Sequence, residues 1–80
     1  MGTAGKALKQ VLATYRISQI QLASTMGIAS GNISRWVNEN RDPSAESAID
    51  IRDALETIDP AAAKAFTFLY WERRIMDEKE

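Results

Sequence analysis

The sequence predicts an all-α fold of five helices. Apolar side chains recur at the 3.6-residue period of a helix along most of the 80-residue chain. No segment alternates apolar and polar residues in the way that a half-buried strand does. Serine, aspartate, glycine and proline stand between the periodic segments, where helices start and stop. The expected helices span residues 4–15, 19–26, 30–37, 45–58 and 60–76, in a single domain covering residues 1–80.

The first two helices are supported by spacing and by their ends. An i, i+3, i+4, i+7 stripe runs along residues 4–15 and consists of Leu8, Val11, Leu12 and Tyr15. Ser18 is a good N-cap for residues 19–26. Gly27 can adopt a positive φ and is expected to end that helix.

The last three helices have similar start signals. Residues 30–37 are expected to begin with Ala29 or Ser30 near the cap, and the polar segment 38–43 then forms a loop. Ser44 is expected to cap residues 45–58. The inner stripe of that helix is Ala48, Ile51, Leu55 and Ile58. Asp59 followed by Pro60 is an N-cap with proline at the first helical position of the last helix.

The segment 19–38 is the most informative part of the chain. Six apolar residues are spaced to face one core: Leu22, Ala23, Met26, Ile28, Ile33 and Trp36. Between them, Ser30, Gly31, Asn32 and Arg35 are left facing solvent. The pattern predicts two short helices joined by a sharp turn, with a polar outer face on the second helix. Such a second helix is typical of one that lies in a DNA major groove.

The charge distribution agrees with a nucleic-acid surface in the first half of the chain. The net charge is −1, but residues 1–41 hold five Lys and Arg against one Glu, a net +4, and residues 42–80 hold a net −5. Attraction to phosphate depends on the local field and not on the total charge.

The absence of two residue types excludes several classes of function. The chain has no Cys and no His, which removes disulfides, the usual structural zinc sites and nucleophile pairs that use His. We therefore expect no enzyme activity, no cofactor and no metal. A chain this short has a small core, which favours a homodimer. No apolar run reaches the ~20 residues of a membrane span, and we expect a cytoplasmic location.

The chain resembles the Cro-like, phage-repressor-like (XRE-type) helix-turn-helix proteins over roughly residues 8 to 58. The resemblance rests on Ser18-Gln19, Leu22-Ala23, Met26-Gly27-Ile28, Ile33-Ser34-Arg35-Trp36 and the loop that ends Arg41-Asp42-Pro43-Ser44. It implies sequence-specific binding to duplex DNA, usually as a dimer that regulates transcription.

The resemblance also implies which residues contact DNA. Ser30, Asn32 and Arg35 match groove-facing positions that contact bases, and Gln19, Asn38, Asn40 and Arg41 match positions that contact phosphates. Arg35 can pair with guanine and Asn32 with adenine. Other roles stay open: a phosphate contact or a solvated charge for Arg35, a phosphate contact or a bond within the helix for Asn32, and a helix cap for Ser30. Lys6 and Lys9 are either further phosphate attractors or simply solvated.

Two residues depart from the family pattern. Gly31 has no side chain, so one common base-reading position is empty. Glu39 stands where the family commonly has glycine and is expected near phosphates. We expect the missing side chain at Gly31 to reduce the number of bases that the helix can read. We expect the charge of Glu39 to weaken the affinity for DNA.

The last helix, about residues 60–76, carries two apolar stripes. One stripe contains Ala62, Phe66, Leu69 and Tyr70, and the opposite one contains Phe68, Trp71 and Ile75. A surface helix needs only one stripe. We expect the second to form a dimer interface, although fuller burial by the N-terminal segment would also account for it.

The sequence thus predicts a small homodimeric transcriptional regulator that acts by occupying its DNA site. The alternative is an antitoxin-like or other protein-interaction module, whose last helix binds a different chain through the same stripe.

Overall fold

The computed structural model describes residues 3–38 and 41–78, and for residues 3 and 72–78 it describes only the helical backbone. The described residues form five helices and no strand, which confirms the predicted all-α fold. The helices are α1 (Thr3–Tyr15), α2 (Gln19–Met26), α3 (Ser30–Val37), α4 (Ala45–Ile58) and α5 (Pro60–Glu78). The bounds of α2, α3 and α4 are those predicted, whereas α1 begins one residue earlier and α5 ends two residues later.

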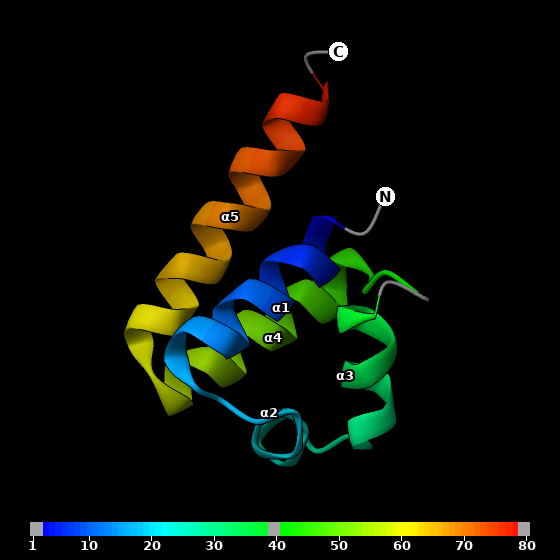
Figure 1. Cartoon of the computed structure of the whole chain (residues 1–80), viewed down its shortest axis with the longest axis vertical. Coiled ribbons are helices and arrows are strands. Elements are labelled where there is room, and N and C mark those ends of the chain that lie inside the picture. The colour runs from blue at the N-terminus through cyan, green and yellow to red at the C-terminus, as the bar shows by residue number, and fades with distance from the viewer. Residues whose placement is uncertain (1–2, 39–40, 79–80) are drawn as a thin grey trace.

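The helices pack around one apolar core. α5 lies against α1 and α4, α2 lies against α3 and α4, and α1 also contacts α3. Figure 1 shows α5 running away from α2 and α3, which form the opposite end of the molecule. The largest fully buried side chains are Phe66, Leu8, Leu22, Ile33, Ile51, Leu55 and Val11. Each of the five helices contributes residues of a predicted stripe to this core, whereas Phe68 and Trp71 of the second α5 stripe lie outside it.

The predicted serine and aspartate caps are present. The Ser18 Oγ accepts a hydrogen bond from the Gln21 amide at 2.9 Å, and the Ser44 Oγ accepts one from the Ser47 amide at 3.1 Å. At the start of α5 the Asp59 carboxylate accepts from the Ala61 amide at 3.1 Å. α3 differs, because its N-cap is Ala29, which has no side-chain acceptor. Ser30 is the first residue of α3, and the option of Ser30 as its cap is wrong.

The end of α1 was not predicted in detail. Arg16 follows the helix in the left-handed conformation with a φ of 57°, and the Ile17 amide donates to the Leu12 carbonyl at 3.0 Å. This conformation costs an L-residue roughly 1–2 kcal/mol. Ile17 is buried at 6% exposure. The burial of Ile17 offsets the cost of the turn and directs the chain into α2.

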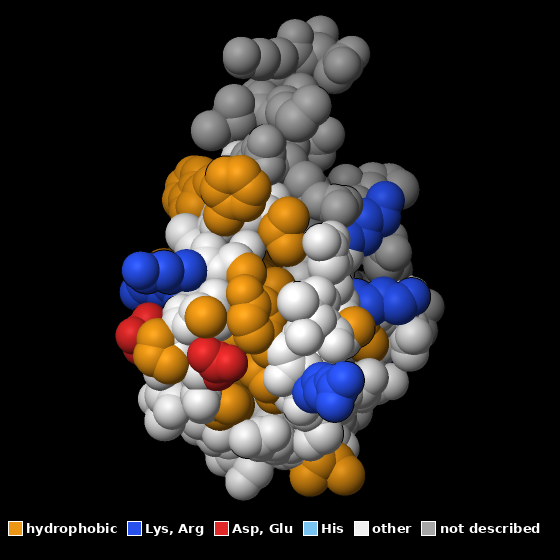
Figure 2. Space-filling model, turned by 60° about the vertical axis from the view of Figure 1, so that its left-hand side comes forward, with side chains coloured by type: hydrophobic (Ala, Val, Ile, Leu, Met, Phe, Trp, Pro, Cys, Tyr) orange, Lys and Arg blue, Asp and Glu red, His pale blue; other side chains and the backbone are white. Residues whose placement is uncertain are grey.

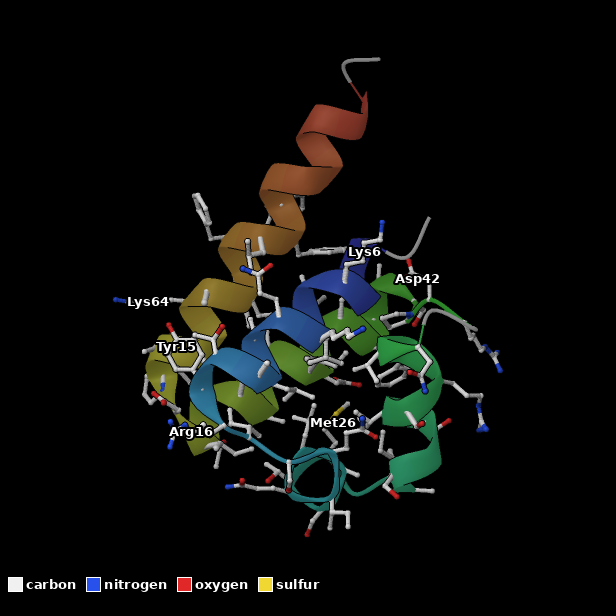
Figure 3. All side chains as sticks on the ribbon, viewed as in Figure 1. Lys6, Tyr15, Arg16, Met26, Asp42 and Lys64 are labelled. Carbon is white, nitrogen blue, oxygen red and sulfur yellow. The ribbon has the colours of Figure 1, made fainter. Side chains whose placement is uncertain are left out.

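α1 and α3 approach most closely at Gly5. A Cβ built on Gly5 would clash with the backbone carbonyl oxygen of Trp36, in α3. The Gly5 amide also donates to the Asp42 carboxylate, which follows α3, at 3.3 Å. Figure 3 shows Asp42 beside the start of α1, close to Lys6. Gly5 therefore lets the start of α1 rest directly on the backbone at the end of α3.

We expect Gly5→Ala to destabilise the protein by about 1–3 kcal/mol, because the added methyl group overpacks against a backbone oxygen that cannot rotate away. Gly31→Ala is the matched control, since Gly31 is also helical and its nearest neighbour to a new Cβ is 3.9 Å away. That change should stabilise by up to about 1 kcal/mol through helix propensity. Urea denaturation followed by circular dichroism measures both. Equal effects of the two substitutions would show that α1 and α3 do not meet at Gly5.

Candidate nucleic-acid interface

A sharp turn joins α2 to α3. Gly27 ends α2 in the left-handed conformation, with φ 75° and ψ 30°. Its amide donates to the Ser24 carbonyl at 3.2 Å, and the Ile28 amide donates to the Ala23 carbonyl at 3.0 Å. These two bonds are the usual closure of a helix by a left-handed glycine. The predicted role of Gly27 is therefore confirmed. Met26, just before the turn, points toward the interior (Figure 3) and is half-buried against the core.

α3 has one buried face and one free face. Ile33, Trp36 and Val37 are buried. Because a helix has about 3.6 residues per turn, Gly31 and Arg35 lie one above the other on the opposite side. Both are exposed. The core side chains thus hold α3 so that the Gly31–Arg35 row points directly away from the protein.

The three predicted base-contacting side chains differ in their surroundings. Ser30 and Arg35 are exposed, whereas Asn32 is half-buried on the flank of α3. The Asn32 Nδ2 donates to the Ala29 carbonyl at 3.3 Å, and the Asn32 Oδ1 accepts from the Arg35 Nη2 at 3.4 Å. Asn32 therefore makes hydrogen bonds within its own helix, which is one of the alternatives that the sequence left open for it.

Two of the predicted phosphate-contacting residues lie together. Gln19, at the start of α2, and Asn38, at the end of α3, line one shallow hollow with Lys9 of α1. The Asn38 Nδ2 donates to the Ser34 Oγ at 3.2 Å. The place of Lys9 beside Gln19 and Asn38 depends on the packing of α1 against α3, which sequence spacing does not show, whereas Ser34 lies four residues before Asn38 on the same helix. The hollow combines amide donors with one cation, which is the chemistry of a phosphate contact.

The loop after α3 flanks its other side. The Arg41 amide donates to the Arg35 carbonyl at 3.4 Å, and the Arg41 side chain is exposed. Arg41 lines a second hollow with Asn32 and Trp36. The first hollow thus holds two predicted phosphate-contacting residues, Gln19 and Asn38, and the second holds one, Arg41, beside Asp42. Asn40 and Glu39 lie outside the described residues.

A separate exposed surface lies on α5. Phe66 is 2% exposed and faces the core, whereas Phe68 is 63% and Trp71 54% exposed. The predicted opposition of these faces is therefore confirmed for Phe68 and Trp71, while the side chain of Ile75 lies outside the described residues. Figure 2, which brings the α5 side forward, shows a band of hydrophobic side chains with Lys and Arg side chains on both sides.

Trp71 also borders a groove between α4 and α5. This groove has a volume of about 420 Å³ and a mainly apolar lining: Ala45, Ala48, Ile49, Arg52, Phe66, Thr67, Tyr70 and Trp71. Ile49, on the α4 wall, is 55% exposed. The Trp71 ring meets the Tyr70 ring edge-on, with centroids 5.8 Å apart. An exposed aromatic ring thus stands beside an apolar groove.

A helix-turn-helix family model matches residues 8–61, which include α2, α3 and the turn between them. The chain belongs to this family. The match confirms the resemblance to XRE-type helix-turn-helix proteins over nearly the predicted range. No curated protein and no solved structure matches the chain.

Membership of the helix-turn-helix family makes the chain a DNA-binding regulator, in a family whose domains are not enzymes. α3 is the second helix of the matched motif. None of the described helices is long and apolar enough to cross a membrane.

Proposed function

We propose that the chain is a sequence-specific transcriptional regulator that binds duplex DNA as a homodimer and acts by occupying its site. The observation that carries this proposal is the free row of Gly31 and Arg35 on α3, which faces away from the buried Ile33, Trp36 and Val37. A helix supported in this way can enter the major groove without loss of core contacts. In this proposal Arg35, Asn32 and Ser30 form the base-reading surface.

The two hollows beside α3 support the assignment of the DNA backbone contacts. We assign Gln19 and Asn38 to one phosphate strand, with Lys9 adding its charge, and Arg41 and Asn40 to the other. The first three line the same hollow. Phosphate contacts fix the register of a protein on DNA, and base contacts then select the sequence.

The groove beside Trp71 supports the homodimer. In a two-fold symmetric interface, each residue of one copy meets the same patch of the other. Trp71 and Phe68 of one copy can enter the groove between α4 and α5 of the second copy, and the reverse contact forms at the same time. Ile75, on the same stripe, extends this interface along α5.

A selection from random duplex DNA with purified protein tests the proposal. We expect an enriched motif with two related half-sites about 10–10.5 base pairs apart. A single half-site would support DNA reading by a monomer and contradict the dimer. No enriched motif, together with a different protein bound stably through Phe68 and Trp71, would favour the interaction-module alternative.

Arg35→Ala should lower DNA affinity by about 1–3 kcal/mol and relax the preference at one base pair in each half-site, because Arg35 is the long cationic side chain on the exposed row of α3. Repetition of the selection with the variant measures this. An equal loss for all sequences would reassign Arg35 to a phosphate contact.

Binding should depend moderately on salt. Arg35, Arg41 and Lys9 are the cations that we assign near DNA, alongside neutral amides at Gln19 and Asn38. The slope of log K against log salt is roughly −0.9 for each phosphate that is neutralised. We expect a slope of about −2 to −6 for the dimer. Fluorescence anisotropy between low and high salt measures it, and affinity that does not change with salt would exclude this interface.

A further inference from the structure

We infer that Asn32 is a positioning residue that holds the guanidinium of Arg35 above Gly31, so that Arg35 reads a guanine from the row where Gly31 has no side chain. This inference rests on the proposed function, because it assigns the readout within the same α3 surface. In place of separate base contacts by Asn32 and Arg35, it assigns one base contact, which Arg35 makes while Asn32 holds the guanidinium.

The guanidinium of Arg35 lies close to Gly31. Arg35 lies one helical turn after Gly31, and side chains on a helix lean toward its N-terminus. The Arg35 Nη1 lies 3.9 Å from a Cβ built on Gly31. The guanidinium therefore extends back along α3 and lies beside Gly31, which stays exposed. A side chain from the next turn thus reaches the position where Gly31 has none.

Asn32 holds the guanidinium in this place. The Arg35 Nη2 donates to the Asn32 Oδ1 at 3.4 Å, and the Asn32 Nδ2 donates to the Ala29 carbonyl at 3.3 Å. Each end of the Asn32 amide thus makes one bond within its own segment. A bidentate contact with adenine needs the same oxygen and the same NH₂ group. One hydrogen and one lone pair remain for it, but the two existing bonds fix the direction of the amide, so Asn32 would have to turn out of that direction to meet a base held elsewhere.

Most of the N–H donors of Arg35 remain available for DNA. A guanidinium has five N–H donors, and one of them is used on Asn32. Nη1 and the second hydrogen of Nη2 stay available, enough for the O6 and N7 atoms of guanine. A long side chain that is ordered before binding loses less rotamer entropy when the complex forms. Asn32 therefore contributes to the guanine preference without touching the base.

The DNA test compares four proteins in the same selection: wild type, Arg35→Ala, Asn32→Ala and the double variant. Arg35→Ala should lower the preference at one base pair by roughly 5-fold to 150-fold. Asn32→Ala should lower the preference at that same pair by a smaller factor, and the double variant should match Arg35→Ala. Loss of preference at a different base pair, or additive losses in the double variant, would mean that Asn32 reads its own base.

Asn32→Asp separates the two roles more sharply. A carboxylate keeps the acceptor for Arg35 but has no NH₂ group for adenine. The preference at the Arg35 base pair should therefore persist, even if the added charge lowers overall affinity. If the preference is lost in Asn32→Asp as fully as in Asn32→Ala, the positioning role is refuted.

A measurement without DNA keeps this inference distinct from the proposed function. ¹⁵N relaxation of the Arg35 Nε–H group reports how ordered the side chain is in the free protein. We expect an ordered group in wild type and Asn32→Asp, and a more mobile one in Asn32→Ala. Equal mobility in all three would overturn the inference even if wild type selects DNA. A failed selection with the expected relaxation would reject the proposed function alone.

Discussion

Trp71→Glu should convert the protein from a dimer to a monomer while its helical content stays the same. Trp71 is 54% exposed beside the α4–α5 groove and is not one of the buried core residues, so within one chain its replacement removes mainly the edge contact with Tyr70. In the dimer, burial of the indole stabilises by roughly 1.5–3 kcal/mol on each side. Two unpaired carboxylates in the same contact would cost several kcal/mol more. DNA affinity should fall steeply, because a monomer contacts one half-site.

Sedimentation equilibrium at micromolar concentration, with circular dichroism, measures this result. Ile20→Glu is the matched control, since Ile20 is 73% exposed on α2, away from α5, and that variant should remain dimeric. If wild type is itself a monomer, the homodimer is wrong and the surface belongs to a different chain. If Trp71→Glu unfolds, Trp71 supports the fold of its own chain.

In contrast to Trp71→Glu, Phe66→Ala should destabilise the fold of each chain, by about 3–5 kcal/mol. Phe66 is 2% exposed and stacks on Tyr70 with ring centroids 6.0 Å apart and planes 5° from parallel. Removal of the ring leaves a cavity where α5 meets the other helices. A loss of this size is a large part of the stability of a small domain.

The effect is best measured by urea denaturation in the Trp71→Glu background, where assembly no longer contributes to stability. Phe68→Ala is the control, because the same residue type stands two positions later at 63% exposure. It should change the free energy of unfolding by no more than about 0.5 kcal/mol. Comparable losses for Phe66 and Phe68 would mean that the two faces of α5 are reversed.

The helices that the sequence predicts best are those with local end signals. Ser18 and Gly27 bound α2, and Ser44 begins α4, each through bonds to residues within a few positions in the chain. Such bonds depend on residue type and spacing, which a sequence displays. The end of α1 is different, because Arg16 adopts a left-handed conformation without glycine. That turn is held by the burial of Ile17, which is a tertiary effect.

The candidate site was predictable to a similar extent. The exposure of Ser30 and Arg35 follows from helical periodicity, since the buried residues of α3 fix its orientation. The bond from Arg35 to Asn32 joins an exposed side chain to a half-buried one, and periodicity predicts no such pairing. The approach of Lys9 to Gln19 and Asn38 depends on how α1 packs, as does the contact of Gly5 with Trp36.

The direct contact of α1 with α3 affects which spacing of half-sites a dimer would bind. α1 contacts both α3 and α5, so the helix that we propose to read DNA and the helix that we propose to form the dimer share one support. Two such units joined through α5 would present their reading helices at a fixed separation and a fixed rotation about the duplex. One inserted base pair turns a half-site by roughly 34° around the DNA axis. The protein would therefore depend on the rotation of one half-site relative to the other about the DNA axis as well as on their base sequences. DNA with both half-sites intact but a spacer changed by one base pair would bind poorly.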